Sequence, residues 1–350
     1  MVSITNSALE PECKKYRYIA DLVNDSALVF DCLSPLYPGS QNTKIFLLCM
    51  SGLLRSICGV MAGGSRAALT QHFTDPVRGS IADVNAKDQS QETVITLVGM
   101  LAGSVLVKMV QGDGIEMWIT VILLLSLHLF TNYKAVSSVI IRTLNRQRTN
   151  IVFSDIIRSL PEIEQAVDST VEDVQKSVSK LLYTPRKASN RERILEPDGL
   201  LRWYSSSGDQ VVGHAEFTGF QSILSILPAS VSLDHLIDAS QATVSGYLIF
   251  YSVRQHRPEL KICLLNSRNK SCDVRAWVHA LLIAQNLVNS PQLQTDPLHV
   301  IRETGRIVDR LFVELNIEPA LASAGWDLDR YAVRSKPNPT VQIELYATKR

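Results

Sequence analysis

The sequence predicts a mainly α protein, in which a helical membrane domain is followed by a small soluble α+β domain. Residues 93–110 and 117–133 are almost entirely apolar and are joined by a short acidic segment, while basic residues flank the pair on its outer sides. Beyond about residue 195, short segments with the alternation typical of strands replace these long runs. We expect a membrane domain in residues 1–150, an amphipathic helix with a basic linker in 151–193, and the α+β domain in 194–350.

The first predicted element is an amphipathic helix over residues 15–33, which the prolines that follow should end. It carries three carboxylates, Asp21, Asp25 and Asp31. Charged side chains are costly in the hydrocarbon core, so this helix is a poor candidate for a membrane span.

A second helix is expected over the apolar run 45–62, which contains Arg55 near its middle. An arginine at that depth costs about 2.5–3.5 kcal/mol on insertion scales. The run is therefore either a weaker span or a helix packed against the others, with Arg55 facing a polar interior.

The two most apolar runs, 93–110 and 117–133, predict a helical hairpin through a membrane. At about 1.5 Å per residue each helix reaches roughly 25 Å, close to the ~30 Å thickness of the hydrocarbon core. Trp118 and Tyr133 stand at opposite ends of the second run, where amphipathic rings favour the headgroup level. The alternative is a buried helical hairpin in a large soluble core.

Charge placement supports the membrane interpretation. The connection 111–116 contains two acids and no Lys or Arg, whereas 134–148 contains four basic residues and no acid. Further basic residues precede the first run. The positive-inside bias therefore places both outer ends of the hairpin on the cytosolic side, in an integral, multi-pass protein whose organelle the sequence leaves open.

The lipid bilayer is thus the first predicted partner. Two small-residue patterns indicate that another helix is the second. Gly59 and Gly63, and likewise Gly99 and Gly103, have the G-x-x-x-G spacing that lets helix backbones approach closely in lipid. We expect helix contacts at these glycines, either within the chain or in a homo- or hetero-oligomer.

Composition narrows the function classes. The 350 residues are 46% hydrophobic and 20% charged with a formal net charge of +1, which argues against a nucleic-acid partner. The six cysteines form no C-x-x-C pair and are interpreted as reduced. No catalytic or phosphate-binding motif and no histidine–cysteine metal pattern is present, so we expect neither a resident metal nor a cofactor.

Polar residues at the predicted membrane face are the candidates for a site. Asp88 and Gln91 have the spacing of a capping box at a helix start, which is the structural interpretation of residues 82–93. His128 lies inside the second span, where an ionisable residue is a functional candidate; a hydrogen bond to a neighbouring helix is the interpretation we favour. The full candidate pocket is Arg66, His72, Asp83, Lys87, Asp88, Gln91, Glu92 and His128.

The remainder of the chain predicts a helix opened by Pro161 with an apolar stripe from Ile163 to Leu181, then a basic linker over 183–193. Such a stripe packs against its own fold or pairs with another helix. Strands are expected at 246–253, 260–265 and 340–347, and helices at 272–287 and 300–315.

Five segments resemble a known family. They read YRYIADLVNDSALVFDCLSPLYP from Tyr16, GVMAGGSRAALTQHF from Gly59, IADVNAKDQSQETVITLVGMLAG from Ile81, LHLFTNYKAVSSVIIRTLNRQR from Leu127 and GWDLDR from Gly325. Together they resemble the root UVB sensitive proteins, closely over residues 16–150 and loosely beyond. The resemblance implies a eukaryotic, membrane-associated protein whose molecular activity is unsettled. Plant relatives in that family are linked to UV-B responses of roots, vitamin B6 balance and auxin transport. No catalytic residue is established for that family, so none is carried over.

Relatives usually have a further segment before the match at Tyr16, and only about fifteen residues precede it here. This difference suggests a shorter isoform or a truncated chain, and leaves the number of spans and any targeting signal open.

Three functions follow as hypotheses. The first is a non-enzymatic scaffold or regulator in the membrane, acting in vitamin B6 or hormone homeostasis. The second is a small-molecule transporter or channel, whose path Arg55, His128 and the 83–92 cluster would line. The third is a cofactor-handling enzyme, which would need a lysine in a pocket beside a phosphate-binding helix N-terminus; Lys87 is its candidate.

Overall fold

The computed structural model describes residues 12–74, 79–110, 114–166, 170–254, 257–265, 271–290, 292, 296–328 and 333. It is mainly α and divides into two compact units. The N-terminal unit is residues 12–139, and the C-terminal unit contains the described residues from 140 onward. The division thus comes eleven residues before the boundary expected at 150, and the predicted helix-and-linker region belongs to the C-terminal unit.

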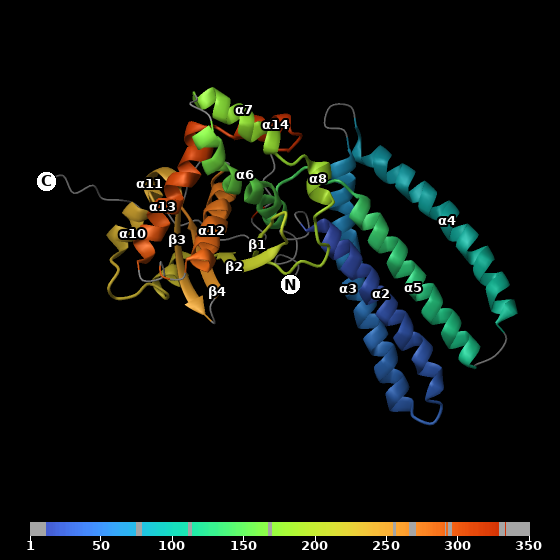
Figure 1. Cartoon of the computed structure of the whole chain (residues 1–350). Coiled ribbons are helices and arrows are strands. Elements are labelled where there is room, and N and C mark those ends of the chain that lie inside the picture. Colours follow the sequence, from blue (N-terminus) through green and yellow to red (C-terminus); the bar gives the residue numbers. More distant parts are fainter. Residues whose placement is uncertain are drawn as a thin grey trace. The chain divides into compact units, whose positions relative to one another are not determined.

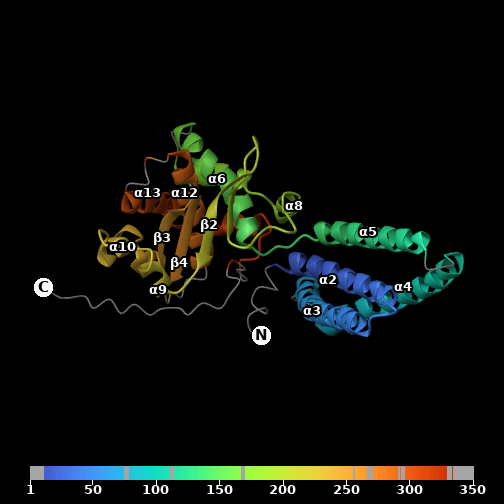
Figure 2. The same ribbon diagram turned by 90° about the horizontal axis from the view of Figure 1, so that it is seen from below.

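The N-terminal unit consists of long helices (Figure 1). Helix α2 spans Cys13–Leu33 and continues into the short 3-10 helix η1 (Ser34–Leu36), as the prolines predict. Helix α3 spans Gln41–Phe73, and its N-cap Ser40 accepts a hydrogen bond from the backbone N–H of Thr43. Figure 2 shows α2 lying beside α3, against which it packs. Small residues of α2, such as Ala20 and Ala27, are fully buried.

Helices α4 (Ile81–Met109) and α5 (Ile115–Ser138) cover the two predicted hairpin runs. Among the described helices, α3, α4 and α5 are long and apolar enough to cross a membrane. The expected capping box is wrong, because α4 begins at Ile81 and Asp88 lies two turns inside it. Residues 81–92 contain no Gly or Pro and favour helix, so the helix extends through the polar segment.

The C-terminal unit is built on a sheet with strand order β1-β2-β4-β3 in its described part. The predicted hairpin is confirmed as β3 (Tyr247–Arg254) paired antiparallel with β4 (Arg257–Leu264). Strands β1 (Leu200–Trp203) and β2 (Gln210–Phe217) were not expected; β2 pairs antiparallel with β1 and parallel with β4. The strand predicted at 340–347 lies outside the described residues.

Helix α12 (Cys272–Asn289) is the centre of this unit's core. It packs against all four strands, and Trp277 and Leu281 are fully buried within it. Helix α6 (Arg146–Ala166) packs against α12 and β1, and α13 (Pro297–Asp309) packs against α12 and β3 (Figures 1 and 2). The remaining elements are α7 (Val171–Leu181), α8 (Pro185–Ser189), α9 (Phe220–Leu224), α10 (Leu233–Ala239), α11 (Ala242–Ser245), the π-helical turn η3 (Arg310–Glu314) and α14 (Glu318–Ser323).

Two expectations about the middle of the chain are corrected. Pro161 does not open a helix, because it lies inside α6, whose apolar residues from Ile151 to Leu160 are buried. The stripe is split between α6 and α7, and in α7 Val174 and Val178 are buried against the unit's own fold.

Candidate functional site

His128 lies near the middle of α5 and contacts the middle of α2. Its Nδ1 is 2.9 Å from Oδ2 of Asp25, and its Nε2 is 2.9 Å from Nδ2 of Asn132, one turn further along α5. An amide nitrogen donates, so Nε2 accepts from Asn132, and the ring proton on Nδ1 is donated to the carboxylate. The hydrogen bond to a neighbouring helix, favoured from the sequence, is what the structure contains.

Asp21 lies one helical turn before Asp25 and adds a second carboxylate to this contact. It is 8% exposed, and its Oδ2 is buried with no hydrogen-bond partner among the described residues. Its other oxygen is 3.8 Å from Nη2 of Arg17, and Asn132 lies within hydrogen-bonding reach of the carboxylate. We call Arg17, Asp21, Asp25, His128 and Asn132 the α2–α5 cluster.

Arg55, the charge within the α3 run, pairs with Asp31 of α2. Its side chain is half exposed. Asp31 is thus the polar partner that an arginine in an apolar run requires. It belongs to α2, the helix whose three acids predicted that it does not cross the membrane.

A separate ion-pair network, the Arg66 cluster, joins the last turns of α3 to the first half of α4. Arg66 donates to Oδ2 of Asp88 from Nε at 3.0 Å and from Nη2 at 2.7 Å, and Nη2 lies 2.8 Å from Oε2 of Glu92. One turn away, the hydroxyl of Thr70 donates to the Asn85 side chain at 3.1 Å. Asp88 therefore forms an ion pair with the guanidinium of Arg66 and does not cap the N-terminus of α4.

The eight candidate residues do not gather in one place. Arg66, Asp88 and Glu92 form the Arg66 cluster, and His128 belongs to the α2–α5 cluster. His72 packs edge-on against the Phe73 ring, with ring centroids 5.3 Å apart. The other three, Asp83, Lys87 and Gln91, lie exposed on α4.

The sequence missed Asp21, Asp25 and Asn132 as site residues. Two carboxylates four residues apart share one helix face, and a lone histidine in an apolar run requires a polar partner. Both signals were present in the sequence. It did not indicate that they belong together, because Asp25 and His128 lie 103 residues apart.

The four glycines of the small-residue patterns lie on open helix faces. A Cβ built at Gly59, Gly63, Gly99 or Gly103 meets nothing within 4 Å. Close helix contacts at these positions are therefore not made within the described chain, and an oligomer formed through them stays a prediction.

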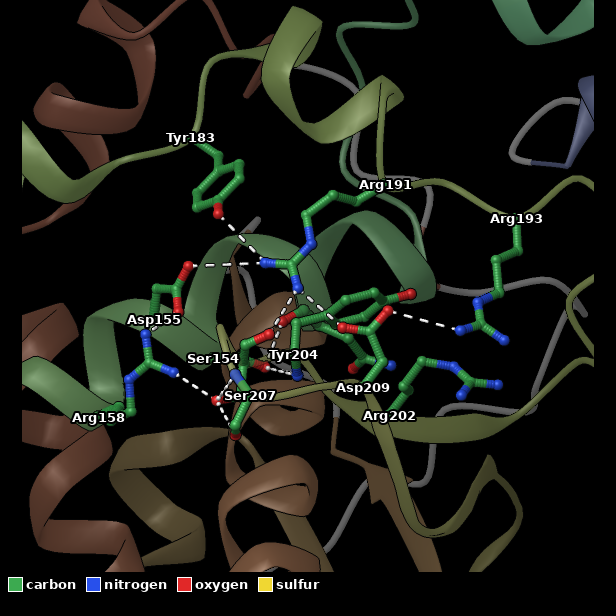
Figure 3. Close-up of polar contacts among 12 residues, drawn as sticks. Ser154, Asp155, Arg158, Tyr183, Arg191, Arg193, Arg202, Tyr204, Ser207 and Asp209 are labelled. Carbon is green, nitrogen blue, oxygen red and sulfur yellow. Dashed lines mark hydrogen bonds and ion pairs between the residues drawn. The ribbon is translucent and has the colours of Figure 1, made fainter.

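The predicted linker over 183–193 is packed into the C-terminal unit. Figure 3 shows Arg191 at the centre of a polar network in which its guanidinium donates to the Tyr183 hydroxyl (3.2 Å) and to Oδ1 of Asp209 (2.8 Å). It also lies over the Tyr204 ring, 5.2 Å from the centroid. These contacts hold the segment against the β1–β2 connection, so Arg191 has a structural role here.

His279 is the most deeply buried histidine of the described residues. Its Nε2–H donates to the carbonyl of Ile301 (3.0 Å), so its Nδ1 accepts from the Tyr247 hydroxyl (3.0 Å). Burial lowers the pKa of His279 to about 4, assisted by nearby Arg275 and opposed by the bond to Ile301. The neutral ring joins β3, α12 and α13.

This burial predicts an acid-sensitive C-terminal unit. Below about pH 6.5 the unfolded chain binds a proton at His279 that the folded unit accepts only near pH 4. The native state should therefore lose about 3 kcal/mol from this group as pH falls from 6.5 to 4, with its full contribution present above 6.5. Urea unfolding of the full chain in detergent, followed by pulse proteolysis of the C-terminal unit, measures this loss. His279→Gln should flatten the pH dependence, whereas the same change at exposed His235 should not.

Comparisons with known proteins address the N-terminal unit and the start of α6. Residues 1–159 match a family described as the vitamin B6 photo-protection and homoeostasis domain. Protein root UVB sensitive 3 of Arabidopsis thaliana is 36% identical over 168 residues, which are 48% of this chain and 37% of that protein. RUS family member 1 of Dictyostelium discoideum is 38% identical over 177 residues, 49% of this chain and 33% of that protein.

A more distant relative is protein root UVB sensitive 2, chloroplastic, of Arabidopsis thaliana, which is 24% identical over 152 residues, 43% of this chain and 34% of that protein. The matched part of the chain spans about a third of the length of each of these relatives. None of the solved structures matches the chain. The resemblance seen in the sequence is confirmed for the matched part of the chain: residues 1–159 contain the domain of the root UVB sensitive family.

Proposed function

We propose that this chain is an integral, multi-pass membrane protein whose helical domain serves as a scaffold or regulator in vitamin B6 homoeostasis. The role in vitamin B6 homoeostasis rests on the description of the family. The membrane role rests on one observation, the exposed apolar surface of α3, α4 and α5.

Exposed large apolar side chains occur along all three helices. Helix α4 has no buried residue, and side chains such as Leu101 (63% exposed) and Leu123 on α5 (64% exposed) face outward. A soluble monomer rarely exposes a contiguous apolar patch above a few hundred Å². Lipid tails remove this surface from water without requiring a protein partner, which favours the bilayer as its environment.

Charge placement supports a particular orientation. Helix α2 packs along α3 and supplies partners to Arg55 and His128, so we include it in the inserted bundle. Four inserted helices place both ends of the unit on one side. The connections 34–40 and 111–116 then share the opposite side, and neither contains Lys or Arg.

The paired charges favour a scaffold over a transport path. Arg55, Arg66 and His128 each contact a carboxylate on a neighbouring helix, and such interhelical bonds hold membrane helices together. A transporter is the second candidate, and the mid-helix position of the His128–Asp25 pair is the observation in its favour. The enzyme hypothesis has less support, because Lys87 lies exposed on α4.

Alkaline-carbonate extraction of membranes from cells expressing the tagged full chain tests this proposal. We expect the chain to remain in the pellet, because four inserted helices resist extraction. Protease protection of N- and C-terminal tags should then place both on the cytosolic side. Release into the supernatant would contradict membrane insertion, and tags on opposite sides would contradict the insertion of α2.

A further inference from the structure

We propose that the α2–α5 cluster is a proton-binding site, in which one exchangeable proton binds at Asp21 beside the hydrogen-bonded pair of Asp25 and His128. This inference rests on the proposed insertion of the helical domain into a membrane. It concerns the regulation of that domain, because the proton binds where α2 meets α5.

The charges of the cluster do not balance without a further proton. Arg17 is the one cation of the cluster, and it stands against the two carboxylates Asp21 and Asp25. The imidazole donates from Nδ1 and accepts at Nε2, which is the arrangement of a neutral ring. One negative charge is therefore left over, and an uncompensated charge is expensive inside a bilayer. A single bound proton cancels it.

Asp21 has the atom that can take this proton. Its Oδ2 is buried and has no hydrogen-bond partner among the described residues, whereas Oδ2 of Asp25 already accepts from His128. A buried carboxylate oxygen without a donor is unfavourable when ionised, and protonation removes that cost. In the binding step a hydronium ion from the solvent transfers a proton to Oδ2: one O–H bond of hydronium breaks, one O–H bond forms at Oδ2, and neutral water is left. The carboxylate becomes a neutral carboxyl group, and release is the reverse.

The remaining groups around Asp21 come from three helices. Helix α2 contributes Arg17 and Asp25, and α5 contributes His128 and Asn132. Helix α3 contributes Cys58, which lies close enough to Asp21 and Asp25 to interact with both carboxylates. Arg55 of α3 is also nearby, but its charge is matched by Asp31. The excess negative charge therefore stays with Asp21 and Asp25.

Proton binding has a direct consequence for helix packing. Two ionised carboxylates one turn apart repel each other, and like-charge pairs at this spacing destabilise a helix. Neutral Asp21 removes the repulsion, while the Asp25–His128 bond is unaffected. The protonated state should therefore hold α2 and α5 together more firmly than the deprotonated state does.

Infrared difference spectroscopy of the full chain in liposomes tests the site, since a protonated carboxyl group has a C=O band that a carboxylate lacks. The pH is changed between about 8 and 5, the window in which imidazole groups and perturbed carboxyls titrate. We expect one such band at low pH, shifted by deuterium exchange and lost in Asp21→Asn. The conservative change keeps the side chain's shape, and Asp31→Asn, on the same helix but paired with Arg55, is the matched control that should keep the band.

The outcomes separate this inference from the proposed function. A chain that stays in the carbonate pellet but whose spectrum has no pH-dependent carboxyl band overturns the proton site alone. A band that survives Asp21→Asn also overturns it, and so does a band that disappears in Asp31→Asn. A spectrum that changes when sodium is added at constant pH overturns it as well. A second variant, His128→Gln, controls for loss of the band through misfolding of the cluster. Its amide keeps a hydrogen-bond donor toward Asp25, so this variant should retain the band. Release by carbonate overturns the proposed function first.

Discussion

Replacing Trp277 by alanine is expected to lower the free energy of unfolding of the C-terminal unit by about 3–5 kcal/mol. The side chain is fully buried in α12, and its ring stacks on Phe217 of β2 with centroids 5.9 Å apart. On the ring also lies the guanidinium of Arg146 from α6, 5.1 Å from the centroid. The indole Nε1–H of Trp277 donates to Oδ1 of Asn150 at 2.8 Å. Truncation leaves a cavity, an amide oxygen without its donor and a buried arginine that has lost one of its two aromatic contacts.

Urea unfolding of the full chain in detergent, followed by pulse proteolysis of the C-terminal unit, measures the loss. Trp277→Phe is the matched variant, because it keeps the ring over Arg146 and removes the indole N–H. It should cost less than the alanine variant, about 1–3 kcal/mol, mainly for the unsatisfied Asn150 oxygen. Val313→Ala, at a position 60% exposed, should change the free energy by less than about 0.5 kcal/mol. Equal effects of Trp277→Ala and Val313→Ala would show that α12 is not the centre of the core.

The elements predicted well from the sequence are those whose pattern is local. Helix α5 was expected from its continuous apolar run, and the β3–β4 hairpin from two β-rich segments joined by a turn. Strands β1 and β2 were missed because their signals are weak. The first is four residues long, and the second contains Gly213 and three polar side chains. Its parallel pairing with β4 depends on a segment about 45 residues further along the chain, such as Glu259 opposite His214.

Helix α6 illustrates a different failure. Its first residues, 146–148, were interpreted as the end of the basic exit of the membrane domain, and Pro161 as a helix start. In the structure, Arg146 and Arg148 are both nearly buried, and Arg148 pairs with Glu192 at 3.0 Å. A basic residue beside a predicted span carries the same sequence signal whether it faces lipid headgroups or a buried carboxylate. Tertiary contacts decide between the two.

The candidate site shows the same limit. The sequence identified His128 and Arg55 as ionisable residues within apolar runs, where charge is costly and a polar partner is needed. It did not identify the partners, since Asp25 and Asp31 belong to another helix. The acids of α2 were taken as evidence against insertion, yet two of them pair with the ionisable residues of α3 and α5.

Replacing Leu123 by arginine should prevent α5 from crossing the membrane. Leu123 lies near the middle of α5 and its side chain is 64% exposed, so arginine there would face the hydrocarbon core. The change costs about 3–4 kcal/mol on insertion scales, which lowers the inserted fraction of the helix by two to three orders of magnitude. Ser138→Arg, at the last residue of the helix, is the control, because a guanidinium there reaches the headgroups.

Accessibility of the α4–α5 connection measures the effect. In a chain whose native cysteines are replaced by serine, Glu116→Cys marks this connection, and a membrane-impermeant maleimide reports which side it faces in sealed vesicles. The parent chain and the Ser138→Arg control should be labelled from the side opposite the C-terminal tag. The Leu123→Arg chain should be labelled from the side of the tag, because a hairpin that fails to insert leaves both its ends there. Unchanged labelling in Leu123→Arg would mean that the arginine faces a protein partner rather than lipid. The open faces at Gly99 and Gly103 of α4 would then be the first place to look for that partner, since helices can approach these glycines closely.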